Sequence, residues 1–122
     1  MAESKTLIEQ GFKYCKHVEG FKTSKLLTIP ILVNMAGMAG ECLLGGLSQK
    51  YQLIADHGDI ISHLTLLKTV LIIPEDVETA SQNIARTTTM CSINTNDEIV
   101  LGELANDIKI LKEWVADKIR EV

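Results

Sequence analysis

A small set of histidines and cysteines supplies the side chains best suited to chemistry. They are His17, His57, His63, Cys15, Cys42 and Cys91. Cys15 and His17 are two residues apart, so on one helix they point to different sides. The gap from His57 to His63 does not match the three- or four-residue spacing of metal ligands on a helix. We therefore predict no metal site and interpret each histidine as a surface or loop imidazole.

Glu41 and Cys42 place a thiol beside a carboxylate, an arrangement that could mark a nucleophile. A nucleophilic thiol needs a lowered pKa, however, and a neighbouring anion raises it. The chain also lacks the GxSxG, Walker, Rossmann and HExxH motifs. We predict no catalytic residues and no cofactor. The alternative is a small enzyme with a pocket near Glu41, Cys42 and His63, which requires these side chains to converge.

The composition is that of one folded domain spanning residues 1–122. Hydrophobic residues make up 46% of the chain and charged residues 23%, which argues against intrinsic disorder. The net charge is -4, and the acidic excess lies in residues 74–122. Arg86 and Arg120 are the only arginines, and no dense basic stripe exists. Strong nucleic-acid binding by the chain alone is therefore not expected.

Three cysteines without a CxxC pair argue against a disulfide framework and favour a reducing compartment. The chain begins without an apolar run, so we expect a cytoplasmic location. The apolar stretch from Leu26 to Leu47 is long enough to cross a bilayer. It contains Pro30, Asn34, Glu41 and four glycines, however, which favours a buried helix in a soluble protein over a membrane span.

Helical periodicity recurs along the chain. Ser4 to Glu19 forms an amphipathic pattern that ends at Gly20, and a second helix runs from Pro30 to about Leu47. Pro30 either follows a helical turn that ends at Ile29 or opens this second helix. In the third segment Asp59 is a plausible N-cap, and the apolar stripe continues to Leu71. A strand over 69–73 (TVLII) is the alternative there.

Pro74, followed by acidic residues, predicts the start of a fourth helix, and the threonines after Ala85 predict fraying. Thr95 and Glu98 form a capping box that opens a long final helix, about residues 96–120. Its apolar stripe is Leu101, Leu104, Ile108, Leu111 and Val115, widened by Trp114 and Ile119. The sequence thus predicts an all-α domain of four or five helices.

Small residues flatten one side of the second helix, where Ala36, Gly37 and Gly40 recur at helical spacing. The face serves either a tight crossing inside the core or a contact between subunits. In the second case the polar side chains of Asn34 and Glu41 would fix the position of one subunit relative to the other. The final helix offers more apolar surface than one core needs. The residues predicted for an interface are Ala36, Gly40, Glu41, Trp114, Ile119 and Val122.

The order of four features resembles HEPN-type helical domains. These are 39–44 (AGECLL) in the second helix, 57–59 (HGD) before the third, 73–76 (IPED) and a closing helix from Glu103 to Lys118. The resemblance implies a compact antiparallel bundle, usually dimeric, often an RNase toxin or the partner of a small nucleotidyltransferase. Ribonuclease members use an arginine followed four to six residues later by a histidine. No histidine follows Arg86, so that catalytic pair is not carried over.

Three functions follow as hypotheses. The first is a non-catalytic interaction or regulatory protein, homo-oligomeric or bound to a helical protein partner through apolar helix faces. The second is a subunit of a nucleic-acid-linked assembly, either a HEPN-like defence or toxin–antitoxin module or a small helical subunit of a nucleoprotein complex, with a basic surface from the N-terminal lysines. These lysines are Lys5, Lys13, Lys16, Lys22 and Lys25. The third is the small enzyme with a pocket near Glu41 and Cys42.

Overall fold

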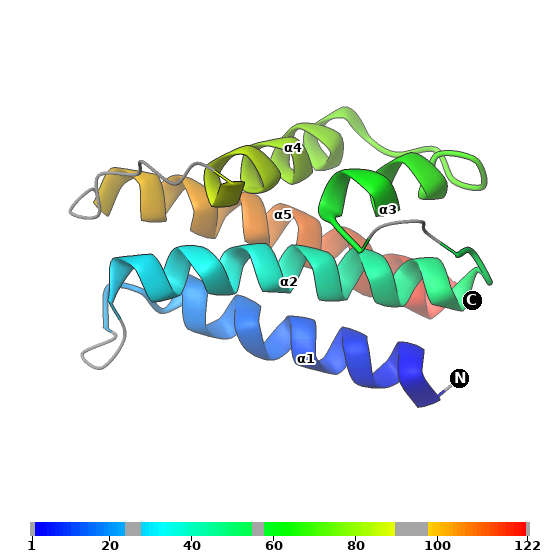
Figure 1. Ribbon diagram of the computed structural model, residues 1–122, viewed down its shortest axis with the longest axis horizontal. Helices are drawn as coiled ribbons and strands as arrows, with labels where there is room; N and C mark the ends of the chain where they lie inside the picture. The colour runs from blue at the N-terminus through cyan, green and yellow to red at the C-terminus, as the bar shows by residue number, and fades with distance from the viewer. Residues whose placement is uncertain (1, 24–27, 55–57, 90–97, 122) are drawn as a thin grey trace.

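The structure is a computed structural model that describes residues 2–23, 28–54, 58–89 and 98–121. These residues form five helices and no strand. The helices are α1 (Ala2–Glu19), α2 (Ile29–Lys50), α3 (Ile60–Leu67), α4 (Glu75–Thr89) and α5 (Glu98–Glu121). In Figure 1, α1 and α2 run in opposite directions, as do α4 and α5, and the short α3 lies between α2 and α4. The all-α bundle with a long C-terminal helix is therefore confirmed.

Helix α2 lies at the centre of the bundle and contacts all four other helices. Its inner side is leucine-rich and packs with the apolar stripe of α5, where Leu101, Leu104, Ile108, Leu111 and Val115 are all buried. The stripe predicted for the final helix is thus the side of α5 that faces the core. Burial of this stripe contributes the hydrophobic stabilisation expected of a domain of this size.

Glycines in α2 allow the neighbouring helices to approach closely. A Cβ atom on Gly46 would lie 2.6 Å from Cγ1 of Ile8 in α1, and one on Gly40 would lie 2.7 Å from Cδ1 of Ile60 in α3. Next to Gly46, the Ser4 hydroxyl donates a 2.7 Å hydrogen bond to the glycine carbonyl. The flat side of the second helix therefore forms tight crossings within the chain.

Helix α2 begins at Ile29 with Pro30 in its first turn, where the missing N–H removes no helical hydrogen bond. Thr28 is the N-cap residue, and its carbonyl accepts from Leu32 N–H at 3.0 Å. By length and composition α2 could cross a membrane, but 67% of its most apolar window is buried inside the bundle. Such burial is typical of the core helix of a soluble protein.

The predicted extension of the third helix to Leu71 is wrong. Helix α3 ends at Leu67, and residues 68–70 form turns closed by hydrogen bonds such as Leu71 N–H to Leu67 O at 2.8 Å. The alternative strand over 69–73 is absent as well. Pro74 disfavours a helical conformation at Ile73, so the chain leaves the helix before it reaches the proline.

The predicted fraying after Ala85 is also wrong, because α4 continues to Thr89. The hydroxyl of Thr88 donates to the carbonyls of Ile84 and Ala85, at 2.8 and 3.2 Å. The Thr88 hydroxyl thus has hydrogen-bond partners on the preceding turn without leaving the helical conformation. The capping box predicted at Thr95 lies outside the described residues. Asp59 takes the N-cap position of α3, but its carboxylate accepts from the Ser62 hydroxyl rather than from a backbone amide.

Candidate functional site

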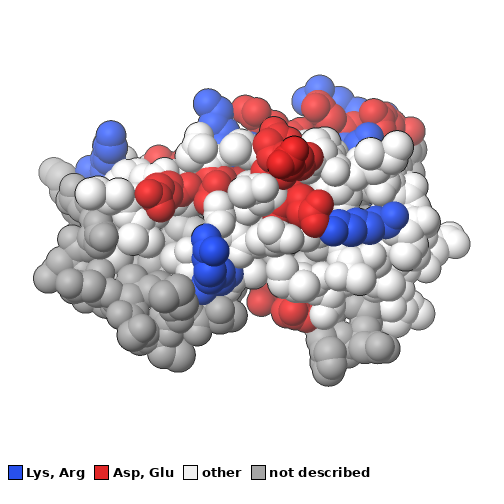
Figure 2. Space-filling view, turned by 90° about the horizontal axis from the view of Figure 1, so that it is seen from above, with Lys and Arg blue, Asp and Glu red and all other residues white. Residues whose placement is uncertain are grey.

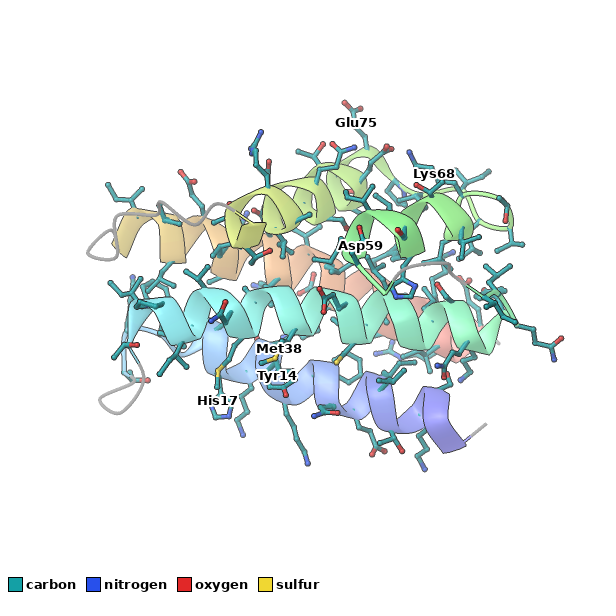
Figure 3. The ribbon with its side chains drawn as sticks, viewed as in Figure 1. Tyr14, His17, Met38, Asp59, Lys68 and Glu75 are labelled. Atoms are coloured by element: carbon teal, nitrogen blue, oxygen red, sulfur yellow. The ribbon has the colours of Figure 1, made fainter. Side chains whose placement is uncertain are left out.

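The outward side of α2 is an apolar strip with a single carboxylate. Ile31, Asn34, Met38 and Glu41 follow one another at steps of three, four and three residues, so they lie on one side of the helix. Ile31 is 42% exposed and Met38 38%. Ile61, on the neighbouring α3, is 42% exposed. We call Ile31, Asn34, Met35, Met38, Glu41 and Ile61 the α2 face. Met38 is labelled in Figure 3.

Three adjoining hollows border this face, and Glu41 lines all of them. The hollow of about 500 Å³ lies over Ile31, Met35 and Met38 and reaches Thr88 of α4. The second, of about 300 Å³, lies where α2, α3 and α4 meet. The third, of about 470 Å³, extends toward α1 and the end of α2. Glu41 is therefore the residue at which the three hollows join.

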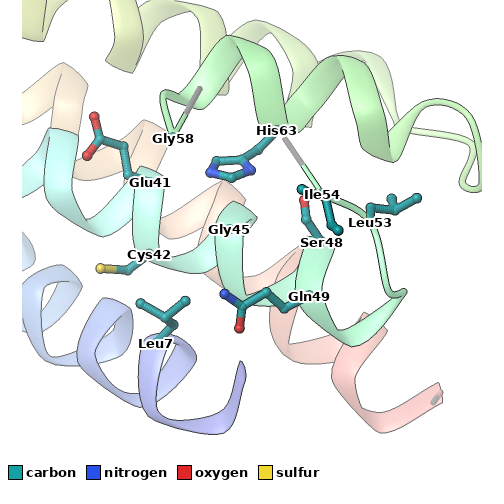
Figure 4. A pocket seen from close by; sticks show the side chains of 10 residues that line it. All are labelled: Leu7, Glu41, Cys42, Gly45, Ser48, Gln49, Leu53, Ile54, Gly58 and His63. Carbon is teal, nitrogen blue, oxygen red and sulfur yellow. The ribbon is translucent and has the colours of Figure 1, made fainter. Parts of the chain in front are cut away.

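The 470 Å³ hollow contains the three side chains of the enzyme hypothesis, Glu41, Cys42 and His63. Figure 4 shows that they do not converge, because the carboxylate of Glu41 and the thiol of Cys42 both point away from the imidazole of His63. The imidazole lies over Gly45, where a Cβ atom would be 3.1 Å from its Nε2 atom. Gly45 thus makes room for the ring, and the ring fills part of the space between α2 and α3.

The raised pKa of the Cys42 thiol opposes nucleophilic chemistry in this hollow. Burial, and then the charge of Glu41, raise the pKa of the Cys42 thiol, so it stays protonated at neutral pH. Burial lowers the pKa of His63, and the smaller effects of Asp59 and the Gly58 backbone oppose that shift. The Nδ1 atom of His63 is buried and has no hydrogen-bond partner among the described residues. His63 is therefore a mostly neutral packing residue.

The 300 Å³ hollow combines charges of both signs. Glu41 from α2, Asp59 at the start of α3 and Arg86 from α4 line it together with the apolar Ile60 and Ile61. Burial, and then the charge of Asp59, raise the pKa of Glu41. The guanidinium of Arg86 donates a 2.6 Å hydrogen bond to the side-chain oxygen of Asn83. Two carboxylates and one guanidinium thus border the same apolar surface.

A separate polar hollow of about 190 Å³ lies between α4 and α5 and is lined by Asn83, Arg86, Glu103 and Asp107, among others. Burial, and then the charge of Glu103, raise the pKa of Asp107 to about 6. Figure 2, which looks onto the molecule from above, shows acidic groups gathered near the middle and basic groups standing apart from one another. Among the residues that the structure describes, no group of three or more His, Cys, Asp or Glu side chains could hold a metal ion.

The residues predicted for an interface occupy different places. Ala36 is fully buried, Gly40 packs against Ile60, and Trp114 is 7% exposed. These three residues pack inside the chain, so a contact between copies would have to use their exposed neighbours. Ile119 is partly buried against the core, and Glu41 is exposed. Val122 lies outside the described residues.

Several residues of the α2 face were missed by the sequence reasoning. Ile31 and Met38 are seven residues apart, a spacing that could have marked a second apolar side on the same helix. Their exposure depends on which side of α2 the other helices cover. In the sequence, Arg86 stands out only as one of two arginines and as an arginine that no histidine follows. Its place beside Glu41 depends on how α4 packs on α2, and no local pattern encodes that packing.

Comparison with solved structures supports the fold. A HEPN domain protein from Thermotoga maritima superposes with a TM-score of 0.70, and the match covers 100% of both chains at 13% sequence identity. The chain therefore has a HEPN-type helical fold, as the resemblance in its sequence implied. No family model matches the sequence, and no curated protein matches it. At this identity the likeness establishes the fold alone.

Proposed function

We propose that this protein is a non-catalytic helical module that self-associates through its α2 face. The observation that carries the proposal is the exposure of Ile31 and Met38 on one side of α2, together with that of Ile61 on the adjacent α3. Contiguous apolar surface on a soluble protein usually marks a contact site. Methionine is well suited to such a surface because its flexible side chain adapts to the opposing one.

The arrangement of the hollows favours a protein contact over a reaction centre. In the hollow shared by Glu41, Cys42 and His63, the thiol and the carboxylate point away from the imidazole, and the pKa of the thiol is raised. A catalytic centre needs its nucleophile and base within hydrogen-bonding reach of each other. Shallow hollows beside an apolar strip instead offer recesses for side chains of a second copy.

Substitutions of Met38 and Ile61 test the proposal. We expect the wild-type protein to sediment as a dimer at micromolar concentration. Met38→Lys and Ile61→Lys should sediment as monomers with unchanged circular dichroism, because each places a charge in the middle of the contact. Ile72→Lys is a matched control, since Ile72 is 93% exposed and lines none of the three hollows that border the α2 face. A monomeric wild-type protein would refute the proposal.

A second candidate function is a subunit of a nucleic-acid-linked assembly. It is favoured by the HEPN-type fold and by the exposed lysines of α1, namely Lys5, Lys13 and Lys16. A dimer formed through α2 would leave these lysines available. Binding of a single-stranded RNA probe by the protein with its co-purifying partners should weaken steeply as salt rises. Absent or salt-insensitive binding would exclude this candidate.

A further inference from the structure

Glu41 is an exposed carboxylate at the point where the three hollows join. No ion pair involves it in the described residues, and the charge that most affects it is the like charge of Asp59. The titratable side chains that share a hollow with it are Cys42, Asp59, His63 and Arg86. Water hydrates this exposed carboxylate in the single chain, but a partner that covers the α2 face removes that water, so the contact must supply a cation or a hydrogen-bond donor. A second copy seated on the α2 face would therefore need a cation opposite Glu41.

Arg86 is the cation that this surface offers. Among the described residues that line the three hollows, it is the sole lysine or arginine. It is exposed and extends from α4 into the same hollow as Glu41. His63 does not provide a comparable charge, because burial lowers its pKa. A second copy seated on the α2 face would bring one more Arg86 to this place.

We propose that Glu41 of one copy forms an ion pair with Arg86 of the second copy, and that a two-fold axis repeats the pair. This inference rests on the self-association proposed above and adds the residues that set its register. In a two-fold contact the same patch is used by both copies, so a glutamate facing an arginine implies the reciprocal pair as well. Because Glu41 and Arg86 border one hollow, an axis through that hollow brings each side chain opposite its complement. A guanidinium can then bind the carboxylate with two parallel hydrogen bonds.

Charge reversal with mixing tests the cross-subunit pair. Glu41→Lys alone places two cations opposite each other across the contact, and Arg86→Glu alone places two acids opposite each other. Each single variant should therefore dimerise at least about tenfold more weakly than the wild-type protein, a loss within the range of close interfacial charge pairs. An equimolar mixture of the two variants restores opposite charges across the interface. We expect heterodimers in the mixture with a Kd within about threefold of wild type.

The mixture separates pairing between copies from pairing within a copy. An ion pair inside one chain would be broken in both single variants and could not be restored by mixing them. Asp117 and Arg120 form an exposed pair on α5, with a 3.6 Å separation between their charged atoms, and supply the control. Asp117→Lys, Arg120→Glu and their mixture should all dimerise like wild type. Circular dichroism of each variant shows whether it remains folded.

The outcomes also distinguish this inference from the proposed function. If Met38→Lys dissociates the protein but the mixture of charge variants stays as weak as its components, the contact exists and the Glu41–Arg86 pair does not. Equal dimerisation of Arg86→Glu and wild type overturns the inference in the same way. If the wild-type protein is monomeric, the proposed self-association is refuted, and the ion pair between copies cannot form. Recovery in the mixture, with unchanged Asp117 and Arg120 controls, supports both.

Discussion

Asp107 on α5 is a carboxyl group whose surroundings disfavour its charge. Burial and the nearby Glu103 raise its pKa to about 6 from 3.8. The folded state therefore binds a proton more tightly than the unfolded state, and the stability contributed by Asp107 increases as pH falls from about 6 toward 4. Asp107→Asn should raise the free energy of unfolding by about 1 kcal/mol at pH 7.5, after allowance for solvent screening.

Urea unfolding at pH 7.5 and at pH 4 measures this effect. The difference between Asp107→Asn and wild type should shrink toward zero at the lower pH, where the carboxyl group is protonated in the folded protein. Glu113→Gln is a suitable control, because Glu113 is exposed on the same helix. An equal difference at both pH values would show that Asp107 acts through packing and not through its charge.

Two glycines in helices show that the same substitution can have opposite effects. A Cβ on Gly46 of α2 would lie 2.6 Å from Cγ1 of Ile8 and 3.2 Å from the carbonyl of Ser4. The nearest atom to a Cβ on Gly102 of α5 is Cζ of Phe21, at 4.0 Å. Gly46→Ala should cost about 1–2 kcal/mol of stability, since overpacking outweighs the gain in helix propensity. Gly102→Ala should stabilise by about 0.5–1 kcal/mol.

Chemical denaturation of both alanine variants checks these values against wild type. The helix propensity gained is the same in the two cases, so the contrast isolates the close approach of α1 to α2. Stabilisation by Gly46→Ala would mean that Ile8 and the α1 backbone can shift at little cost. The close packing of α1 against α2 at Gly46 would then not require a glycine at this position.

The helices were largely predictable from the sequence because each buries one apolar stripe. The stripe from Leu101 to Val115 located α5, and proline located the starts of α2 and α4. The end of α3 was not predictable from spacing, since Leu71 continues the apolar stripe although the chain has already left the helix. Helix propensity alone also predicted the wrong end for α4, where the Thr88 hydroxyl bonds to the preceding turn. Hydrogen bonds and a downstream proline decided these two ends.

Much less of the candidate site could be predicted. Glu41 attracted attention as a lone carboxylate in an apolar helix, and the structure places it where three hollows join. Its relation to Arg86, far along the chain, arises only from the packing of α4 on α2. The small residues Ala36 and Gly40 were predicted for an interface, but their side of α2 faces the core. Periodicity identifies an apolar side of a helix without saying which neighbour covers it.

At the level of the whole molecule, self-association makes thermal stability depend on protein concentration. Unfolding of a dimer releases two chains, so a higher concentration favours the folded state by mass action. A tenfold increase in concentration corresponds to about 1.4 kcal/mol per dimer. For a unit of two such chains this should raise Tm by about 3–5 °C. Calorimetry from 5 to 500 µM measures the shift, and Met38→Lys should show a Tm independent of concentration. A wild-type Tm that stays constant over this range would mean that α2 keeps its apolar face exposed in a monomer.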